Sequence, residues 1–459
     1  MMRLSEIAMA TQGQLIGADV EVCCVGTDSR AIQAGQLFVA LQGEHFDGHD
    51  YLAQSLAQGA SAVLVAKAGD QYPAVLVKDT RLALGTLAAH WRAKFQMPVV
   101  AITGSNGKTT VKEMLAAILR VAAGDDNDVL ATKGNLNNDI GLPLTMLNLG
   151  NQHRYAVLEM GMNHSGEIAY LTQLAKPNVA LVNNAGTAHI GQLGSVEAIA
   201  KAKGEIFSGL SDQGIAILNA DDDFVDLWRK LASQYQQISF GLDKPADVTA
   251  KYRLSANNSD MQLITPVGEV ALALPAPGLH NVRNALAAAA AALALQVPLA
   301  DIATGLSHFA GVKGRLQSKA GWAGAKLIDD TYNANPLSMQ AAIDVLKASS
   351  GQRIFVMGDM AELGADAASM HAEIGQYAKA AGIQHFLALG ALSQEAVTAF
   401  GEGAQHCASV ETLVDALKPM LNADVTVLVK GSRSMRMEQV VDAIQAQTKS
   451  HQGESQVCC

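Results

Sequence analysis

Apolar residues along most of the chain come in short runs separated by longer segments with helical spacing. Between residues 81 and 313, four runs rich in Val, Ile, Leu and Ala are each followed closely by Gly, Asn or Asp. Short apolar runs of this kind are typical of strands buried on both faces, and their alternation with helices indicates a parallel sheet wrapped by helices. The predicted strands span residues 99–102, 155–160, 179–182 and 215–218.

Two helices are predicted in the same region. Apolar residues at 111, 114, 115, 118, 119 and 122 follow the i, i+3, i+4 spacing of one helix face, so a helix should begin near Lys108. The Ala-rich run that starts at Asn284 predicts a buried helix, because alanine has the highest helix propensity. We assign its alanines to packing alone.

The two flanking regions carry their own α/β patterns. Before residue 81, apolar runs at 37–41, 62–66 and 74–77 alternate with turn-rich segments, which indicates a small α/β module. Beyond residue 313, runs at 326–328, 353–357, 385–389 and 425–429 alternate with helical patterns, as in a second doubly wound domain. We therefore predict three α/β domains, over residues 1–80, 81–313 and 314–459.

Composition supports a folded, multidomain chain and excludes several classes of protein. The chain has 459 residues, of which 49% are apolar and 17% charged, which excludes a disordered or fibrous protein. A net charge of -10 disfavours a nucleic-acid partner, because binding to the phosphate backbone needs a basic face. Local basic spots for a small phosphorylated ligand remain compatible with it.

The absence of a targeting signal and the use of cysteine predict a cytoplasmic protein, which we also expect to be a monomer. The N-terminus has no sustained apolar stretch, and the longest apolar run, residues 285–295, is too short to span a membrane. The cysteines at 23, 24, 407, 458 and 459 fit neither a disulfide framework nor a zinc site. We expect free thiols in a reducing compartment.

A phosphate-binding loop is the clearest chemical motif. Residues 99–110, VVAITGSNGKTT, run from a predicted strand through a Gly-rich turn into a predicted helix. Gly104 and Gly107 allow backbone N–H groups to face an anion, Lys108 adds a charge, and the Thr109 hydroxyl can ligate Mg²⁺. Ile102 stands where the general P-loop pattern has Gly. The flanking elements nevertheless favour a nucleoside triphosphate site over a plain turn.

Further metal ligands are expected where neighbouring strands end, because ligands of open α/β sheets collect at that edge. Glu159 ends the predicted strand at 155–160, and His189 follows the strand at 179–182 by a short loop. A lone His is more often structural, but the position of His189 favours a ligand.

Nine segments then carry a resemblance to a known family. The loop ITGSNGKTT resembles the ATP loop of the Mur ligase superfamily, which has two residues between its glycines and so accounts for Ile102. Residues 27–51 resemble the uridine-nucleotide domain of its members that add the third and last peptide units. The remaining segments resemble the branch that adds the last unit: 132–145, 158–168, 183–190, 200–207, 278–288, 311–317 and 329–339.

The resemblance implies an N-terminal UDP-sugar domain, a central ATPase, and a C-terminal domain of dinucleotide-binding type that closes over the nucleotide. It also implies a reaction. ATP phosphorylates the terminal carboxylate of a UDP-N-acetylmuramoyl tripeptide, and the amine of D-alanyl-D-alanine attacks the acyl phosphate. A carboxylate is a poor electrophile until it is phosphorylated. Because the carboxylate and the γ-phosphate are both anions, Mg²⁺ and Lys108 would be needed to neutralise the charge of the γ-phosphate.

The resemblance also assigns roles around the nucleotide. Gly104, Ser105, Asn106, Gly107, Lys108, Thr109 and Thr110 form the ATP loop, and Glu159 and His189 match metal ligands. Lys203 matches a lysine that related ligases carry as a carbamate, a modification favoured by burial, which lowers a lysine pKa. Lys201 is close enough to compete, and a solvated lysine is the alternative.

Nucleotide and substrate contacts are implied at further positions. Asn281 matches the adenine side, with an N-cap role as the competing interpretation. Arg315 matches a phosphate contact and Asp330 a ribose contact, although charge pattern alone makes both exposed polar residues. The uridine-diphosphate site is matched by Ser29 and Arg30, and the muramoyl-peptide site by Asn135, Asn137 and Asn138, which could equally form a turn. For the dipeptide we expect Asn333 to Ser338 or the segment at Ser432.

Two rival functions stay open at this point. One is another ligase of the superfamily, but the chain lacks the DNPR segment of the diaminopimelate-adding enzyme, and its N-terminal module disfavours a folylpolyglutamate synthetase. The other is a nucleotide-dependent binding protein without catalysis. Intact Lys108, Glu159 and His189 argue against it.

Overall fold

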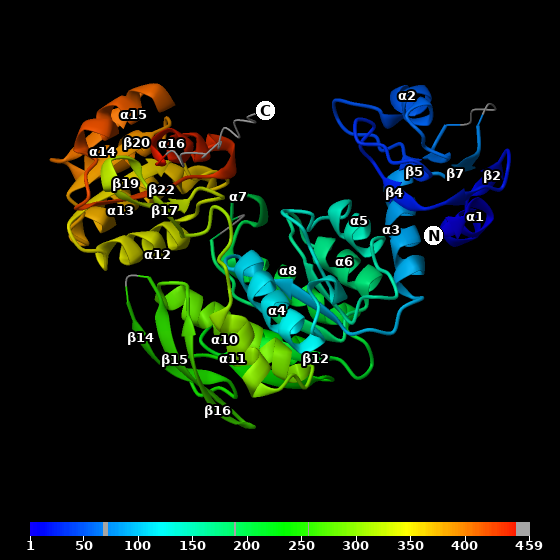
Figure 1. Cartoon of the computed structure of the whole chain (residues 1–459), viewed down its shortest axis with the longest axis horizontal. Helices are drawn as coiled ribbons and strands as arrows, with labels where there is room; N and C mark the ends of the chain where they lie inside the picture. The colour runs from blue at the N-terminus through cyan, green and yellow to red at the C-terminus, as the bar shows by residue number, and fades with distance from the viewer. Residues whose placement is uncertain (68–71, 188–189, 256, 447–459) are drawn as a thin grey trace, which may run out of the picture.

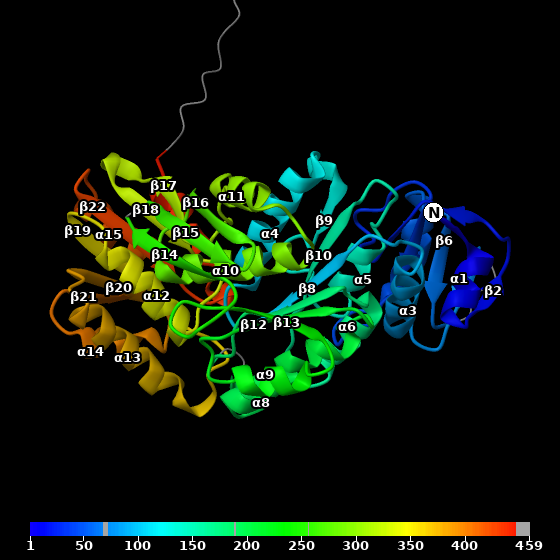
Figure 2. The same cartoon turned by 90° about the horizontal axis from the view of Figure 1, so that it is seen from below.

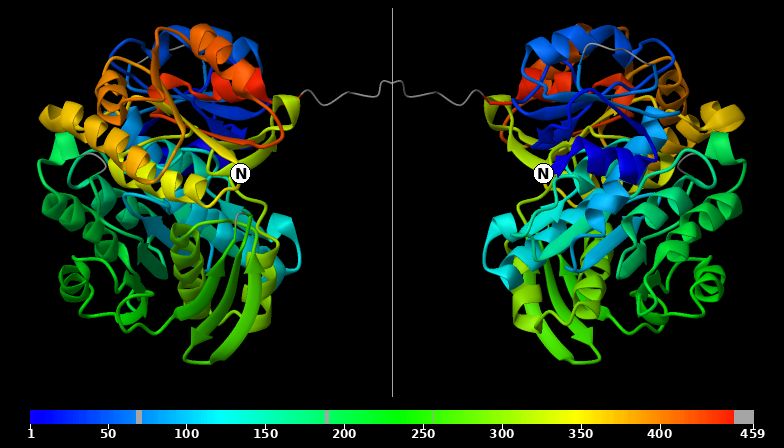
Figure 3. Two further views of the ribbon diagram at one scale, coloured as in Figure 1. Left: turned by 90° about the vertical axis from the view of Figure 1, so that its left-hand side faces the viewer. Right: turned by 90° about the vertical axis from the view of Figure 1, so that its right-hand side faces the viewer.

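The computed structural model describes residues 1–67, 72–187, 190–255 and 257–446, and Figure 1 shows three α/β units that follow one another along the chain. This confirms the predicted fold class. The N-terminal and C-terminal units lie at opposite ends of the molecule, with the central unit between them (Figure 1). The end-on views of Figure 3 place both on the same side of the central unit.

The N-terminal unit has a five-stranded sheet in the order β2-β7-β6-β5-β4. Strands β4 to β7 run parallel to one another, and the edge strand β2 is antiparallel to β7. The strands are β2 (Gln14–Ile16), β4 (Cys24–Gly26), β5 (Gln36–Val39), β6 (Ala62–Val65) and β7 (Ala74–Leu76), and the helices are α1 (Leu4–Thr11), α2 (Leu52–Ala57) and α3 (Thr80–Arg92). A short pair, β1 (Met2–Arg3) and β3 (Glu21–Val22), lies beside them.

The central unit has a six-stranded, fully parallel sheet in the order β13-β12-β11-β8-β10-β9. Successive residues of β8 face opposite sides, so Val99 and Ala101 join one core while Val100 and Ile102 join another. Helices therefore cover both faces, with α4, α10 and α11 on one and α6, α8 and α9 on the other (Figure 2). The strands are β8 (Val99–Thr103), β9 (Val129–Ala131), β10 (Tyr155–Glu159), β11 (Val179–Val182), β12 (Ile215–Asn219) and β13 (Gln236–Phe240).

The predicted helices of this unit are present. The helix expected near Lys108 is α4, and the Ala-rich run belongs to α10, which begins five residues before Asn284. The helices are α4 (Lys108–Ala123), α5 (Gly141–Met146), α6 (Glu167–Ala175), α7 (Ile190–Leu193), α8 (Val196–Gly204), α9 (Val225–Leu231), α10 (Leu279–Ala294) and α11 (Leu299–Ser307).

A three-stranded antiparallel sheet in the central unit was not predicted. It consists of β14 (Thr249–Leu254), β15 (Ser259–Thr265) and β16 (Gly268–Leu274) and packs against α10 and α11 (Figure 1). Only β15 alternates regularly between buried and less buried residues, and β14 is mostly exposed. An exposed strand lacks the continuous apolar run from which the other strands were predicted.

The C-terminal unit has a six-stranded sheet in the order β17-β18-β22-β19-β20-β21, in which only the edge strand β17 is antiparallel. All four strands predicted here are present. The strands are β17 (Gln317–Ala320), β18 (Lys326–Asp330), β19 (Gln352–Gly358), β20 (His385–Leu389), β21 (Ala404–Cys407) and β22 (Val425–Lys430). The helices are α12 (Pro336–Lys347), α13 (Ala367–Ala380), α14 (Ser393–Phe400), α15 (Val410–Leu417) and α16 (Glu438–Ile444).

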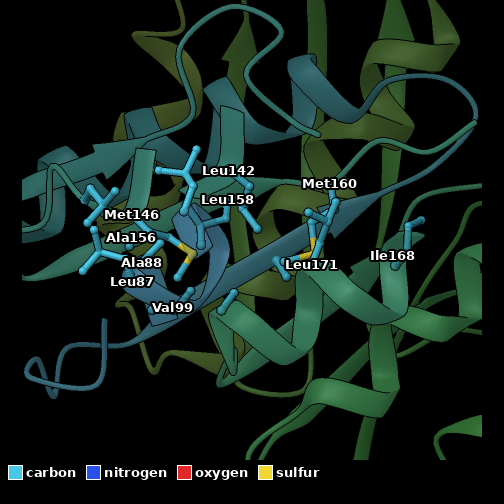
Figure 4. Close-up of a cluster of buried hydrophobic side chains, with 14 of the residues drawn as sticks. Leu87, Ala88, Val99, Leu142, Met146, Ala156, Leu158, Met160, Ile168 and Leu171 are labelled. Carbon is cyan, nitrogen blue, oxygen red and sulfur yellow. The ribbon is translucent and has the colours of Figure 1, made fainter. Parts of the chain in front are cut away.

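Helix α3 joins the cores of the first two units. Its residues Leu87 and Ala88 are buried beside Leu142 and Met146 of α5 and Leu158 of β10 (Figure 4). The same continuous cluster includes Leu4 and Leu64 of the N-terminal unit. The C-terminal unit instead has two separate clusters on the two faces of its own sheet. Among the described helices, none combines the length and apolar character that crossing a bilayer requires.

Candidate active site

A cavity of about 790 Å³ lies where the C-terminal unit meets the carboxyl ends of the central strands β8 and β10. Strand β8 has the later strands β11 to β13 on one side and β10 and β9 on the other, so the cavity opens at the switch point of the sheet, where such folds bind ligands. Ten predicted site residues line it: Ser105, Asn106, Gly107, Lys108, Asn135, Asn137, Asn138, Glu159, Arg315 and Asn333.

The phosphate loop connects β8 to α4, as predicted. Gly107 stands at the N-terminus of α4 with a φ of 78°, a left-handed conformation that favours glycine. A Cβ atom there would lie 2.3 Å from Oδ1 of Asn284 and 2.6 Å from Nδ2 of Asn183. Gly107 is therefore required both by the turn and by the close packing of two asparagines.

Two adjacent asparagines after β11 hold the loop, and sequence reasoning did not select them. Asn183 donates from Nδ2 to the Asn106 carbonyl at 2.9 Å and to Oδ1 of Asn284 at 3.1 Å. Asn184 accepts the Asn106 N–H through Oδ1 at 2.8 Å. The available signal was an Asn pair directly after a buried strand, at the edge where ligands bind.

Lys108 is one of the residues that line the cavity. Its half-buried side chain donates from Nζ to the Gly104 carbonyl at 2.7 Å, folded back over the loop. Burial lowers the pKa of Lys108, the negative Glu159 opposes that shift, and the positive Arg315 adds to it. These influences bring an ammonium, a carboxylate and a guanidinium from three segments into one electrostatic environment.

Glu159 is buried at the end of β10, with 2% of its surface exposed. Its Oε1 accepts a hydrogen bond from Nδ2 of Asn137 at 2.8 Å, whereas its buried Oε2 has no hydrogen-bond partner among the described residues. A buried carboxylate oxygen without a donor is costly, unless a cation supplies the missing interaction. The orphan oxygen is the observation that best fits a metal ion at this place.

Lys203 and Lys201 differ sharply in environment. Lys203, near the end of α8, is 1% exposed and forms no hydrogen bond or ion pair with a described residue, while Lys201 is exposed and pairs with Glu197 at 2.7 Å. Burial, followed by the nearby Lys108, lowers the pKa of Lys203 well below its ordinary value. A neutral amine suits Lys203 to carbamate formation, and the solvated-lysine alternative fails for it.

The other predicted metal ligands are only partly placed. Thr109 is 7% exposed at the start of α4, and His189 lies outside the described residues. Within the described ranges, no cluster of three His, Cys, Asp or Glu side chains is arranged to hold a metal. Of the predicted ligands that the structure describes, Glu159 and Thr109 offer oxygen atoms, the type of donor that Mg²⁺ prefers.

The C-terminal unit reaches the phosphate loop at two points. Nη2 of Arg315 lies 3.5 Å from Oγ1 of Thr109, and its guanidinium stacks 4.2 Å above the ring of Tyr332. Asn335 donates from Nδ2 to Oδ1 of Asn106 at 2.8 Å. Arg315 was predicted as a phosphate contact, but Asn335 was not singled out.

A second cavity of about 360 Å³ lies on the other side of Arg315 and is lined by Thr110 and Asn281 as well. Asn281 is buried in the first turn of α10 and donates from Nδ2 to the Pro277 carbonyl at 2.8 Å. The N-cap of α10 is Gly278, so the competing interpretation of Asn281 as the cap is wrong.

Asp330 corrects an expectation drawn from charge pattern. It is buried, with 6% of its surface exposed, rather than an exposed polar residue. Its Oδ1 accepts the Leu316 N–H at 3.1 Å, and its Oδ2 accepts from Nζ of Lys430 at 2.6 Å. Arg315, by comparison, is half-buried.

The three asparagines before α5 have different environments. Asn137 orients Glu159, and Asn138 accepts the Gly141 N–H at 2.8 Å, which closes the turn into α5. None of the three has a positive φ, so a left-handed Asn turn is absent here. Asn135 is exposed at the cavity. The neighbouring Asp139 pairs with Arg81 of α3, a cavity residue that sequence reasoning also missed.

Ser29 and Arg30 lie in the N-terminal unit and line neither cavity. Arg30 is exposed, and two of its nitrogens each lie 2.9 Å from a different carboxylate oxygen of Asp28. The guanidinium of Arg30 lowers the pKa of Asp28 to about 2. The two segments expected for the dipeptide do converge, since Asn333, Ser338 and Ser432 all line the large cavity.

Taken together, the fold and the cavity define a P-loop protein of three α/β units in which the last unit completes the phosphate site. Comparison with known proteins then identifies the family. Residues 102–292 match the Mur ligase middle domain, residues 314–433 the Mur ligase, glutamate ligase domain, and residues 21–92 the Mur ligase family, catalytic domain.

Individual relatives agree over nearly the full length. The chain is 46% identical to the UDP-N-acetylmuramoyl-tripeptide--D-alanyl-D-alanine ligase of Escherichia coli (strain K12), covering 96% of this chain and 98% of that protein. It superimposes with a TM-score of 0.90 on MurF from Acinetobacter baumannii, with 40% identity and coverage of 95% and 97%. The MurF ligase of Thermotoga maritima in complex with ADP gives a TM-score of 0.81, 28% identity and coverage of 92% and 96%. The chain belongs to the Mur ligase family, as its motifs predicted.

Proposed function

We propose that the protein joins D-alanyl-D-alanine to UDP-N-acetylmuramoyl tripeptide with consumption of ATP, through an acyl phosphate, releasing ADP and phosphate. The observation that carries the proposal is the large cavity, in which the phosphate loop, Glu159 and the last unit's Arg315 converge. The extended identity to a ligase named for these two substrates supports the choice within the family.

Each unit has a part in this proposal. Residues 1–80 bind the UDP sugar through Ser29 and Arg30, residues 81–313 bind ATP, and residues 314–459 close over ATP and bind the dipeptide. The position of the cavity between the second and third units supports this division. The enzyme is also proposed to be cytoplasmic and monomeric, and the free thiols of Cys23, Cys24 and Cys407 fit a reducing compartment.

ATP spans both cavities in the proposed complex. Its phosphates lie on the loop residues 104–110, at the N-terminus of α4, where backbone N–H groups and the helix dipole favour anions. The adenine occupies the smaller cavity beside Asn281, and Arg315, which lines both cavities, contacts the phosphates between them. Asp330 contacts the ribose with the lone pairs that Leu316 and Lys430 leave free, because a carboxylate has about four acceptor sites.

Phosphoryl transfer brings two anions together, the tripeptide carboxylate and the γ-phosphate. Lys108 and Arg315 place positive charge where the negative charge of the transition state develops. Glu159, Thr109, His189 and a carbamate on Lys203 are the proposed metal-site residues, and bound Mg²⁺ would supply charge neutralisation of the phosphate oxygens. Asn137 fixes the Glu159 carboxylate so that its free Oε2 faces this site.

Amide formation then requires the dipeptide amine to reach the acyl carbon before water does. Asn135, Asn137 and Asn138 hold the muramoyl peptide on the central unit, and Asn333 with its neighbours holds the dipeptide on the last unit. The contacts of Arg315 and Asn335 with the loop keep the two walls together and restrict access of water.

The test measures ADP release with UDP-N-acetylmuramoyl tripeptide in the presence and absence of D-alanyl-D-alanine. Turnover that needs both substrates is expected. Turnover with a single amino acid or with a folate in place of the dipeptide would identify another ligase of the superfamily. ATP binding without turnover under any of these conditions would indicate a non-catalytic nucleotide-binding protein.

The carbamate on Lys203 has its own test. In the presence of ¹³C-bicarbonate, nucleotide and Mg²⁺, the protein should show a carbamate carbon signal that is lost in Lys203→Ala and kept in Lys201→Ala. An unmodified amine at Lys203 in a crystal structure with nucleotide and metal bound would refute the carbamate.

A further inference from the structure

A buried lysine at the end of β22 links the two segments through which the last unit contacts the phosphate loop. We call residues 314–316, which carry Arg315, the hinge arm, and residues 331–335, which carry Asn335, the loop arm. Arg315 approaches Thr109, and Asn335 is bonded to Asn106, so each arm touches the phosphate loop through one side chain. The arms are separated in sequence by strands β17 and β18.

Lys430 is bonded toward both arms. Its Nζ donates to Oδ2 of Asp330 at 2.6 Å and to the carbonyl of Asn333 at 2.9 Å. Asp330 in turn accepts the backbone N–H of Leu316 through its other oxygen at 3.1 Å. One ammonium group therefore connects the backbone of the hinge arm, through Asp330, with the backbone of the loop arm. This link adds to the direct bond in which the Tyr332 N–H donates to the Gly314 carbonyl at 3.1 Å.

The hinge arm needs such a restraint. Leu316 has a φ of 49°, a left-handed conformation that is unfavourable for a residue with a branched side chain, and it directly follows Arg315. The hydrogen bond from its N–H to Asp330 is a contact that holds this conformation. The orientation of the Arg315 guanidinium thus depends on the position of Asp330.

The charges around Lys430 show that it is not a solvated surface lysine. It is 3% exposed, and Asp330 is its ion-pair partner, while Arg315 and His280 are positive or potentially positive groups near it. Burial lowers the pKa of Lys430, and Asp330 opposes that shift. Lys430 lines neither of the two cavities, so it acts through other residues rather than on a ligand.

We propose that Lys430 is a positioning residue for phosphoryl transfer: it fixes the hinge arm and the loop arm relative to each other, and so aligns Arg315 and Asn335 on the phosphate loop. The proposal rests on the function proposed above. Misplacement of a transition-state contact by about 1 Å can cost on the order of 100-fold in rate, so loss of Lys430 should appear mainly in kcat.

The test compares Lys430→Met with the wild-type chain in the ADP-release assay. We expect kcat per folded molecule to fall on the order of 10- to 100-fold, while the KM for the UDP substrate changes by less than about 3-fold. Lys319→Met is the matched control, because Lys319 pairs with the buried Asp329 at 2.7 Å in the same sheet, and Asp329 bonds to Thr331 of the loop arm but its side chain bonds to no residue of the hinge arm, so this variant does not uncouple the two arms. It should keep the wild-type kcat.

A double-mutant comparison distinguishes a positioning role of Lys430 from a purely structural one, because only a positioning role makes the effects of the substitutions on kcat non-additive. In a background of Arg315→Ala with Asn335→Ala, where neither arm can reach the loop, Lys430→Met should lower kcat by less than about 3-fold further. An equal loss in both backgrounds, or an unchanged kcat in the single variant, would overturn the proposal. If Lys430→Met fails to fold, Lys430→Gln, which removes the positive charge and shortens the side chain by one atom, takes its place. Absence of turnover in the wild-type chain would instead count against the proposed function.

Discussion

Active-site side chains differ in how completely the rest of the protein satisfies them. Both carboxylate oxygens of Asp330 accept hydrogen bonds from the chain itself, whereas Glu159 has one oxygen bonded and one buried without a partner. An unsatisfied buried oxygen costs on the order of 1–3 kcal/mol. A bound cation would supply the missing interaction at the cavity wall, so Glu159 is the stronger candidate for direct chemistry.

Substitution of Lys108 should separate activity from folding. We expect Lys108→Ala to lower kcat by roughly 10²–10³-fold, because it removes a positive charge aimed at the transferred phosphate. The free energy of unfolding should change by less than about 1 kcal/mol, since the side chain makes one hydrogen bond, to the Gly104 carbonyl. ADP release and circular dichroism check the two expectations. Lys201→Ala, which removes an exposed lysine, is the control, and loss of the folded spectrum in Lys108→Ala would contradict the assignment.

Substitution of Glu159 should weaken the Mg²⁺-dependent activity without lowering the stability of the fold. Glu159→Gln keeps an acceptor for Asn137 but removes the buried charge, so the free energy of unfolding without metal should not fall. The Mg²⁺ concentration that gives half-maximal activity should rise by about 10-fold or more, since an outer-shell loss alone already costs 10–100-fold. Chemical denaturation and a Mg²⁺ titration of ADP release measure the two effects. Reduced stability with an unchanged Mg²⁺ requirement would assign Glu159 to the fold alone.

Most of these residues lie in recognisable sequence motifs. Lys203 was predicted only from the family resemblance, because nothing in the segment AKAKGEIF distinguishes it from Lys201. Their burial differs because α8 turns one lysine toward the core and the other toward solvent. Asn335 and Lys430 act through contacts with residues distant in sequence, so no local pattern reveals their roles. Asn183 had a local signal, the Asn pair after β11, but its partners Asn106 and Asn284 are also distant.

Among the elements, α4 carries a glycine with positive φ at each end, and the two glycines have different surroundings. A Cβ atom on Gly107 would lie 2.3 Å from Asn284, whereas one on Gly124 would meet no atom within 4 Å. Both have left-handed φ values, 78° and 88°. The backbone penalty is thus shared, and only Gly107 adds a clash in the ATP loop.

The pair Gly107→Ala and Gly124→Ala isolates that clash. Gly124→Ala should destabilise the protein by about 1 kcal/mol and leave the KM for ATP unchanged, because only the left-handed backbone is strained. Gly107→Ala should destabilise it by about 2 kcal/mol more, since the buried asparagines must move, and raise the KM for ATP. Thermal unfolding and steady-state kinetics provide both readouts. Equal behaviour of the two variants would show that the asparagine packing is unimportant.

The elements were predicted best where apolar residues are continuous. Strand β11 matches its predicted bounds, since it is buried on both faces. The sheet β14–β16 was missed because one of its faces meets solvent, as the exposed Tyr252 and Leu254 of β14 indicate. Its place against α10 and α11 follows from the tertiary packing rather than from the periodicity of the strands.

In the whole molecule, α3 makes the first two units share one core, while the C-terminal unit has its own. Leu87 of α3 is fully buried in the shared core, and Leu82 on the same helix is 56% exposed. Cooperative unfolding follows a continuous core, so the N-terminal and central units should lose structure together.

Leu87→Ala tests this cooperativity. It should lower the free energy of unfolding by about 2–5 kcal/mol, and hydrogen exchange should increase in both β6 and β10. Leu82→Ala, the control on the same helix, should change stability by less than about 0.5 kcal/mol. If exchange increases in only one of the two sheets, the units unfold separately and the shared core does not couple them.

The sequence by itself determined the α/β class, the three successive units, and the phosphate loop between β8 and α4. These features depend on local periodicity and on residues adjacent in the chain, which a pattern can record. Only the tertiary structure decided that Glu159 keeps a free oxygen, that Lys203 rather than Lys201 is buried, and that Arg315 and Asn335 reach the phosphate loop. Those facts depend on burial and on contacts between distant segments, which arise only when the chain packs.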